Sequence, residues 1–269
     1  MLDHYVSRAV EGLDLSEVEQ IAADETSVRR AGHDYISLFV DMVRRKVVYV
    51  ADGKDAATVD GFAAFLEAHG GKRENITDAS IDMGAAFIAG VKANFPNAKI
   101  TFDKFHVIKL VNEAVDEVRR TEAKHNDWIK GTRYLWLKNL QNLDEEEKAS
   151  IVRLEAVNLD TMQGPADPHE FAGRLHDAER GEREKFLHRW HAWVSTCDLQ
   201  PMEKVAATIM AKADEILRSI SSNLSNGLLE AINGNVQAAK RKAKGYRTKH
   251  NLKLMVYLIA GGVLDALPT

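Results

Sequence analysis

The chain has 269 residues, 36 basic and 40 acidic side chains, a formal charge of -4, and 45% hydrophobic residues, which is the composition of an ordinary globular protein. This composition excludes an intrinsically disordered chain, no apolar run is long enough to span a membrane, and the N-terminus resembles neither a signal nor a transit peptide, so a cytoplasmic protein without membrane contact is expected. The single cysteine, Cys197, excludes internal disulfides and a Cys-rich zinc module, so any metal ion would be bound by oxygen or imidazole ligands.

The first part of the chain is predicted to be an α/β unit. Residues 1–20 form an N-terminal helical lead-in, and residues 21–106 then alternate between short strands and amphipathic helices. Thr58 is the expected N-cap of the first of these helices. The predicted order is βββαβαβ, with strands at 20–24, 35–40, 46–50, 75–81 and 98–102 and helices at 59–68 and 83–95.

The strand pattern ends near residue 106. Residues 107–222 form charged amphipathic segments, which predict an all-helical insertion of more than 100 residues. Its one clear loop is 161–168, which contains two prolines and a glycine. Residues 223–269 then contain two more helices, predicted at 226–244 and 252–264.

Carboxylates occur where the predicted strands end. Asp24, Asp82 and Asp103 close the first, fourth and fifth strands, and Glu230 lies on a helix far along the chain. Neighbouring strands can bring such residues together, and oxygen ligands suit Mg²⁺, of which a pair can support phosphoryl transfer. Each acid taken alone is better explained as a solvated turn residue, so spacing by itself is a weak signal.

Three segments match one family in the same order. They are residues 23–35, residues 81–107 with the block Pro96-Asn97-Ala98 followed by Asp103-Lys104-Phe105-His106, and residues 225–247 around Glu230. Together they resemble the catalytic domain of bacterial insertion-sequence DDE transposases, in particular the ISL-three (ISL3) group. The resemblance covers roughly residues 21–264.

The resemblance implies a ribonuclease-H-like mixed sheet with the helical insertion placed before the last catalytic helix. It implies that Asp24, Asp82 and Glu230 are the catalytic carboxylates and bind Mg²⁺ (or Mn²⁺), as two ions. Asp103 and His106 would form an accessory D-x-x-H element near this site. His106 would hydrogen-bond the scissile phosphate or orient a carboxylate, although a structural role is equally open.

Two nearby carboxylates are alternatives to this assignment. Glu25 follows Asp24 directly, and its side chain should point to the opposite face of an extended strand. Asp78 lies four residues before Asp82, and the residues alone leave it open. Asp82 is preferred because it falls at the end of the strand and fits the family pattern.

One stretch of the chain is strongly basic. Seven basic residues and no acidic residue lie between Asn235 and Lys253, following Glu230. Such a run is either a solubilising helix face or a surface for the DNA backbone. Asn226 and Asn233 are accessory candidates, because they lie on the same helix face as Glu230 and would position its carboxylate, contact DNA or cap the helix. The predicted DNA-binding residues are Lys240, Arg241, Lys242, Lys244, Arg247 and Lys249.

The aromatic and histidine residues of the insertion suggest packing rather than chemistry. Trp190 and Trp193 could stack on an unpaired base, but their apolar helical positions favour a place in the core. His188 and His191 lack a third zinc ligand in the sequence nearby.

The sequence departs from the family pattern at its N-terminal end. Relatives carry a zinc ribbon and a helix-turn-helix ahead of the catalytic domain, and this chain is expected to contain neither. The predicted function is DNA phosphodiester cleavage at transposon ends followed by strand transfer, carried out by a homo-oligomer on DNA. The alternatives are an inactive or domesticated remnant that only binds DNA or a partner, and a stand-alone nuclease.

Overall fold

The computed structural model describes residues 2–28, 34–102, 104–125, 127, 130, 132, 135, 143–155, 171, 173–175, 180–221 and 227–263. Its backbone contacts divide the chain into two compact units. The first, here called the sheet unit, comprises Met1–Asp103 and Ser222–Thr269, and the second, the helical unit, comprises Lys104–Ser221. The functional division of the chain into a catalytic core and an insertion stays a prediction.

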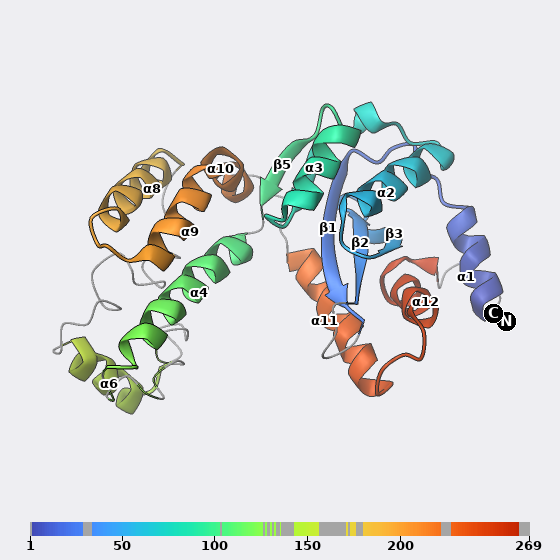
Figure 1. Ribbon diagram of the computed structural model, residues 1–269. Helices are drawn as coiled ribbons and strands as arrows, with labels where there is room; N and C mark the ends of the chain where they lie inside the picture. The colour runs from blue at the N-terminus through green and yellow to red at the C-terminus, as the bar shows by residue number, and fades with distance from the viewer. Residues whose placement is uncertain are drawn as a thin grey trace. The chain divides into compact units, whose positions relative to one another are not determined.

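The sheet unit is built on a five-stranded mixed sheet with strand order β3-β2-β1-β4-β5 (Figure 1). Strand β2 pairs antiparallel with β1 and β3, whereas β4 pairs parallel with β1 and β5. This arrangement confirms the predicted βββαβαβ order and the ribonuclease-H-like fold. The elements are β1 (Gln20–Ser27), β2 (Tyr35–Asp41), β3 (Lys46–Asp52), α2 (Ala56–Ala68), η1 (Arg73–Asn75), β4 (Asp78–Ile81), α3 (Ala85–Asn94) and β5 (Lys99–Phe102).

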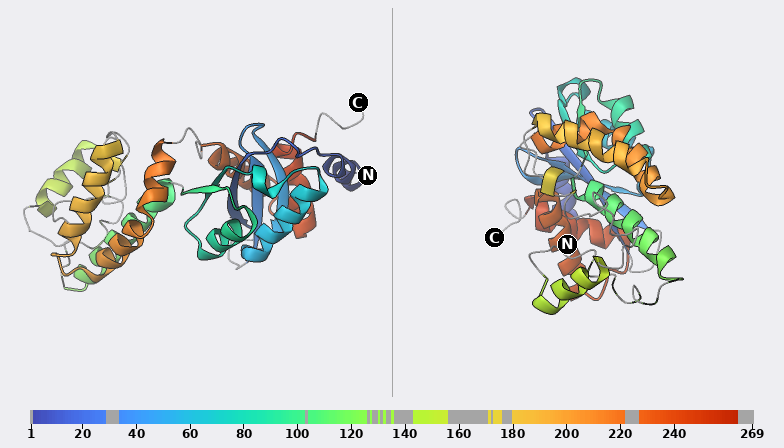
Figure 2. Two further views of the ribbon diagram at one scale, coloured as in Figure 1. Left: turned by 90° about the horizontal axis from the view of Figure 1, so that it is seen from above. Right: turned by 90° about the vertical axis from the view of Figure 1, so that its left-hand side faces the viewer.

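Helices cover both faces of the sheet, with α2 and α3 on one side and α11 (Gly227–Lys242) and α12 (Lys249–Ala260) on the other (Figures 1 and 2). On the first face, the rings of Phe39 and Phe62 stack with centroids 4.5 Å apart. On the second face, Leu38 shares a buried apolar cluster with Val236 and Val256. Because neighbouring residues of a strand point to opposite faces, Phe39 and Leu38 serve different layers. Residues 227–263 therefore complete the same core as the first strands.

Several predicted boundaries were wrong; β4, for example, begins at Asp78 rather than at residue 75. Strand β1 does not end at Asp24, because its antiparallel pairing with β2 continues to Ser27, so Asp24 lies inside the strand. Helix α2 is capped by Asp55 rather than Thr58, because the Asp55 carboxylate accepts the hydrogen bond of the Thr58 N–H at 3.2 Å. Pairing with β2 thus sets the end of β1, and the cap formed by Asp55 sets the start of α2.

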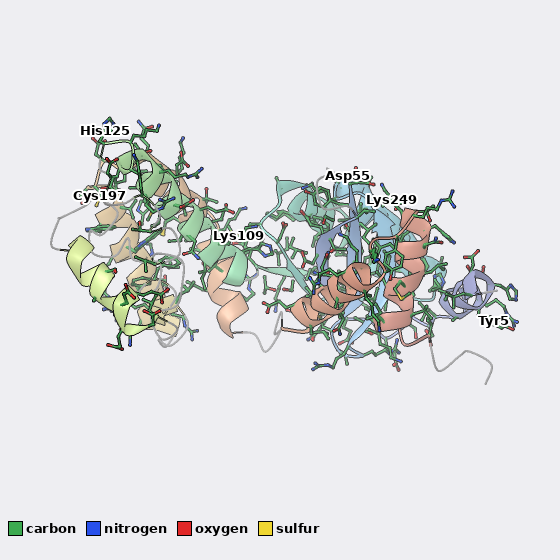
Figure 3. The ribbon with its side chains drawn as sticks, turned by 90° about the horizontal axis from the view of Figure 1, so that it is seen from below. Tyr5, Asp55, Lys109, His125, Cys197 and Lys249 are labelled. Atoms are coloured by element: carbon green, nitrogen blue, oxygen red, sulfur yellow. The ribbon has the colours of Figure 1, made fainter. Side chains whose placement is uncertain are left out.

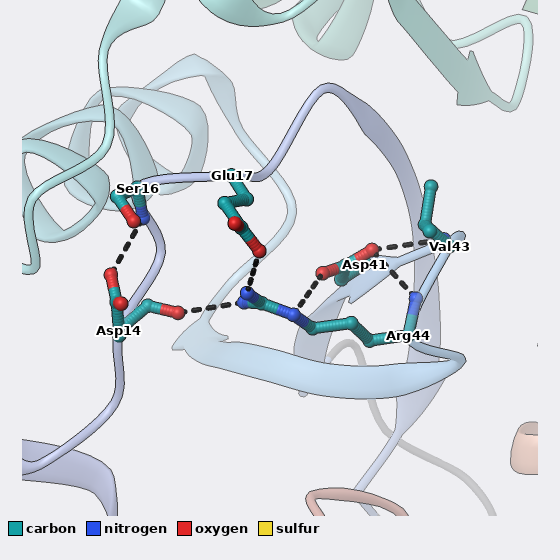
Figure 4. A network of polar contacts seen from close by, with 6 residues as sticks. All are labelled: Asp14, Ser16, Glu17, Asp41, Val43 and Arg44. Atoms are coloured by element: carbon teal, nitrogen blue, oxygen red, sulfur yellow. Dashed lines mark hydrogen bonds and ion pairs between the residues drawn. The ribbon is translucent and has the colours of Figure 1, made fainter.

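The segment that precedes β1 is fixed to the β2–β3 turn by a polar network (Figure 4). Arg44 donates to the Asp14 carbonyl oxygen at 2.7 Å and to Glu17 Oε2 at 3.0 Å. The buried Asp41 accepts the backbone N–H groups of Val43 and Arg44, which closes the turn. Helix α1 (Leu2–Glu11), which begins this segment, contacts α12.

The helical unit has a separate apolar core. Its described helices are α4 (Lys104–Glu122), α6 (Glu145–Glu155), α8 (Arg180–Val194), α9 (Gln200–Met210) and α10 (Ala213–Ser221). Trp190 is 1% exposed, with its ring 4.7 Å from that of Phe171, so it packs in the core as its position indicates; Trp193 is half-buried. The loop predicted at 161–168 lies outside the described residues. No helix in the described part of the chain is long and apolar enough to cross a membrane.

Candidate active site

Asp24 lies on the face of β1 that contacts α11. Its Oδ2 accepts a hydrogen bond from Asn233 Nδ2 at 2.5 Å, and its Oδ1 accepts one from the backbone N–H of Glu25 at 2.7 Å. Because Ala22 packs in the apolar cluster on the same face, β1 presents first an apolar and then a charged side chain to α11. The half-buried carboxylate is thus held in one orientation by two donors.

Asp82 directly follows β4, and its Oδ1 accepts the backbone N–H of Gly84 at 2.7 Å. Gly84 is the N-cap of α3, and a β-carbon built on it would lie 2.7 Å from that same oxygen. The carboxylate therefore occupies the space that a side chain at position 84 would need. This turn fixes Asp82 against the start of a helix.

The pairing of β1 with β4 relates the two aspartates. Ala22 lies beside Ser80 in parallel register, and Asp24 and Asp82 each come two residues later. Parallel strands lie about 4.8 Å apart, so two residues that each lie the same number of positions beyond a paired residue are neighbours at the same end of the two strands. Asp78, by contrast, lies beside Gln20, at the other end of the pairing.

Glu230 is exposed in the first turn of α11, three residues before Asn233. One helical turn thus separates Glu230 from the side chain that binds Asp24. Across the described residues, no three Asp, Glu, His or Cys side chains form a ready-made metal cluster. Asp24 and Asn233 are in contact.

The donor set fits a hard divalent cation. Asp24, Asp82 and Glu230 offer carboxylate oxygens, and Mg²⁺ binds through one or two carboxylates while keeping several waters. Asn233 Oδ1 is buried and accepts no hydrogen bond from the described residues, which is the state expected beside a site that holds water or an ion. The residues present therefore fit the metal that the sequence implies.

The remaining candidates are distributed as follows. Glu25 pairs with Lys54, Oε1 to Nζ 3.4 Å, rather than with α11. His106 is half-buried in the first turn of α4, in the helical unit. Asp103 and Asn226 lie outside the described residues, so their accessory roles stay predictions.

Two contacts between β1 and α11 were missed from the sequence. Gln237 Nε2 donates to the buried Thr26 Oγ1 at 2.5 Å, and Lys240 Nζ donates to the Ser27 carbonyl oxygen at 2.6 Å. With Asn233 they form a line at helical spacing, which we call the polar stripe of α11. The available signal was the occurrence of polar residues four and seven positions after Asn233, on the face that also carries Leu229 and Val236 as neighbours.

The basic residues of this region fall into two groups. Lys240 is bound to Ser27, and partial burial lowers its pKa. Lys249, at the start of α12 (Figure 3), forms an ion pair with Asp34 that raises the lysine pKa, and Lys253 pairs with Asp52 at 3.1 Å. The other four are exposed and form no ion pair with a described residue; we call them the basic turn, and they are Arg241, Lys242, Lys244 and Arg247.

Comparison with known proteins confirms the family resemblance of the sequence. The model of the ISL3 family of DDE transposases, described as a transposase, matches residues 21–256. The chain is 28% identical over 261 residues to the transposase for insertion sequence element IS1001 of Bordetella parapertussis, covering 90% of this chain and 61% of that protein. It is 26% identical over 282 aligned positions to the transposase for IS1557 of Mycobacterium tuberculosis, covering 94% and 62%. The chain spans about three fifths of the length of these relatives, and it belongs to the ISL3 family of DDE transposases.

Proposed function

We propose that this chain is the catalytic part of a transposase that cleaves DNA phosphodiester bonds at transposon ends and joins the freed 3′-hydroxyl to target DNA. The observation that carries the proposal is the hydrogen bond between Asn233 and Asp24. It places the helix that bears Glu230 against the strand that bears Asp24, next to the strand that leads to Asp82. Membership of a transposase family supports the same reaction class.

In this proposal Asp24, Asp82 and Glu230 hold two Mg²⁺ or Mn²⁺ ions. Bound divalent ions would supply an activated water or 3′-hydroxyl and would stabilise the leaving oxygen. The chain's own contribution is positional. The Glu25 N–H and Asn233 hold the Asp24 carboxylate, and the Gly84 N–H holds the Asp82 carboxylate, before any ion binds.

DNA is the proposed partner, and a homo-oligomer on DNA is the proposed assembly. The basic turn follows Glu230 by 11 to 17 residues and ends α11, which the Gly245 N–H closes on the Lys240 carbonyl oxygen at 2.8 Å. Its side chains are exposed and carry no internal counter-charge from the described residues, so they suit a phosphate backbone. Lys240 and Lys249, predicted as DNA contacts, have partners inside the protein.

The test combines metal binding with DNA cleavage. Mn²⁺ binding is measured by calorimetry, with and without a short duplex, for the wild type and for Asp24→Asn, Asp82→Asn and Glu230→Gln. Nicking of supercoiled plasmid is followed on the same samples. Glu25→Gln is the matched control, because Glu25 is the neighbour of Asp24 and its carboxylate pairs with Lys54. We expect the three site variants to lose Mn²⁺ binding and nicking, and the control to keep both.

The opposite results identify the alternatives. A wild type that binds no more Mn²⁺ than Asp82→Asn, even with DNA present, would make the chain a DNA- or partner-binding scaffold. Nicking that depends on all three carboxylates but never yields joined strands, on any plasmid or transposon end supplied, would make it a nuclease. Loss of Mn²⁺ binding in Asp78→Asn but not in Asp82→Asn would move the second carboxylate to Asp78.

A further inference from the structure

In the polar stripe of α11, the amide of Asn233 has a hydrogen-bond partner for its nitrogen but none among the described residues for its oxygen. Gln237 and Lys240 bind the hydroxyl of Thr26 and the carbonyl of Ser27, both of which are neutral groups. Asn233 alone binds a carboxylate, that of Asp24. Since the carboxylate needs a donor, Nδ2 must face Asp24, and the amide oxygen is forced to the other side.

That oxygen, Asn233 Oδ1, is buried and accepts no hydrogen bond from the described residues. A buried acceptor without a donor costs free energy, and native proteins nearly always provide a protein group or an ordered water for it. The hydrated divalent cation proposed at Asp24 would supply such a donor. Mg²⁺ keeps several of its waters when bound through one or two carboxylates, and each water carries two O–H groups.

We infer that Asn233 is a positioning residue of the metal site. Its Nδ2–H orients Asp24 towards the ion, and its Oδ1 accepts a hydrogen bond from a water of the ion's hydration shell. The inference rests on the proposed function, because it needs a divalent cation at Asp24. Groups that orient ligands in this way commonly change metal affinity by 10- to 100-fold, which sets the size of the expected effect.

The experiment measures Mn²⁺ affinity by calorimetry and thermal unfolding with and without Mn²⁺. Asn233→Leu removes both polar ends of the amide at similar volume. Gln237→Leu is the matched control, since it removes a contact of equal length one turn along the same stripe without touching a carboxylate. We expect both variants to unfold at lower temperature than the wild type without metal. Mn²⁺ affinity should fall about 10- to 100-fold in Asn233→Leu and stay within about twofold in Gln237→Leu.

Asn233→Asp provides a second test with a different signature. It replaces the donor by a second carboxylate oxygen at hydrogen-bond distance from Asp24, so the metal-free protein should be less stable than the wild type. Mn²⁺ should then relieve the repulsion and raise the unfolding temperature by more than it does in the wild type. A carboxylate at position 233 that faced away from the ion would give no such gain.

Two results would overturn the inference alone. They are an Asn233→Leu variant that binds Mn²⁺ as tightly as the wild type, and an Asn233→Asp variant whose Mn²⁺-induced shift equals that of the wild type. In both cases Asp24→Asn would still abolish binding, and the proposed function would stand. A wild type that binds Mn²⁺ no better than Asp24→Asn would overturn both.

Discussion

At the scale of single residues, the structure separates cations that hold the protein together from cations that face solvent. Lys240 donates to the Ser27 carbonyl, next to the strand that carries Asp24, whereas Arg241 is exposed and forms no ion pair in the described part of the chain. The two residues are adjacent in sequence but point in different directions from α11. A run of basic residues is therefore not a uniform DNA-binding surface.

This separation predicts two different phenotypes. If the basic turn contacts DNA as proposed, Arg241→Met or Lys244→Met should each reduce the magnitude of the slope of log K against log salt concentration by about 0.9 for a DNA duplex, because each would remove one phosphate contact. Lys240→Met should leave that slope unchanged and lower the free energy of unfolding by about 1 kcal/mol, through loss of its hydrogen bond. Fluorescence anisotropy at 50–200 mM salt, together with urea unfolding, measures both. An equal loss of slope in Lys240→Met would contradict the assignment.

At the scale of helices and strands, α12 protects the free edge of the sheet. Strand β3 is an edge strand, and the backbone N–H of Val50 donates to Tyr257 Oη at 3.1 Å. An unpaired N–H on an edge strand would otherwise be available to another chain. Burial raises the pKa of Tyr257 well above its ordinary value, so the side chain remains a neutral phenol.

The raised pKa makes stability depend on pH in alkaline solution. Because the tyrosine of the unfolded chain ionises near pH 10, its contribution is fully present below that pH and is lost as pH rises towards the higher folded pKa. Above about pH 10 the wild type should lose up to about 1.4 kcal/mol per pH unit more than Tyr257→Phe. At pH 8 the variant should be less stable by about 1 kcal/mol, since Val50 loses its acceptor. Urea unfolding from pH 8 to 11 measures the difference, and parallel curves would refute it.

The same scale shows what the sequence could predict. Strand β3 and helix α2 are recognisable because an apolar run and its turn residues are adjacent in the chain. The length of β1 could not be predicted from the sequence, because its last three residues are strand only through pairing with β2. Asn233 could be placed on the face of Glu230 from helical periodicity, but its bond to Asp24 joins residues 209 positions apart. No local pattern contains that contact, and the assignment of Asp24 and Glu230 to one site came from the family resemblance.

At the scale of the whole molecule, the chain contains two separate apolar cores. The sheet unit is packed around residues such as Phe62, and the helical unit around residues such as Trp190, each at most 1% exposed. The sheet unit contains two stretches of chain, Met1–Asp103 and Ser222–Thr269. The helical unit, Lys104–Ser221, lies between them in the sequence, so it interrupts one continuous core. Each core is therefore expected to lose its own stability when its own aromatic residue is removed.

Trp190→Ala and Phe62→Ala test this expectation as a reciprocal pair. Each substitution deletes a buried aromatic side chain and should cost about 3–5 kcal/mol in its unit. Hydrogen exchange followed by mass spectrometry should show faster exchange in α4, α8 and α9 for Trp190→Ala, with β1, β2 and β3 as protected as in the wild type, and the reverse for Phe62→Ala. If the cores were instead one cooperative structure, either substitution would accelerate exchange in both units. Since the three proposed catalytic carboxylates all belong to the sheet unit, Mn²⁺ affinity should then survive Trp190→Ala and fall in Phe62→Ala.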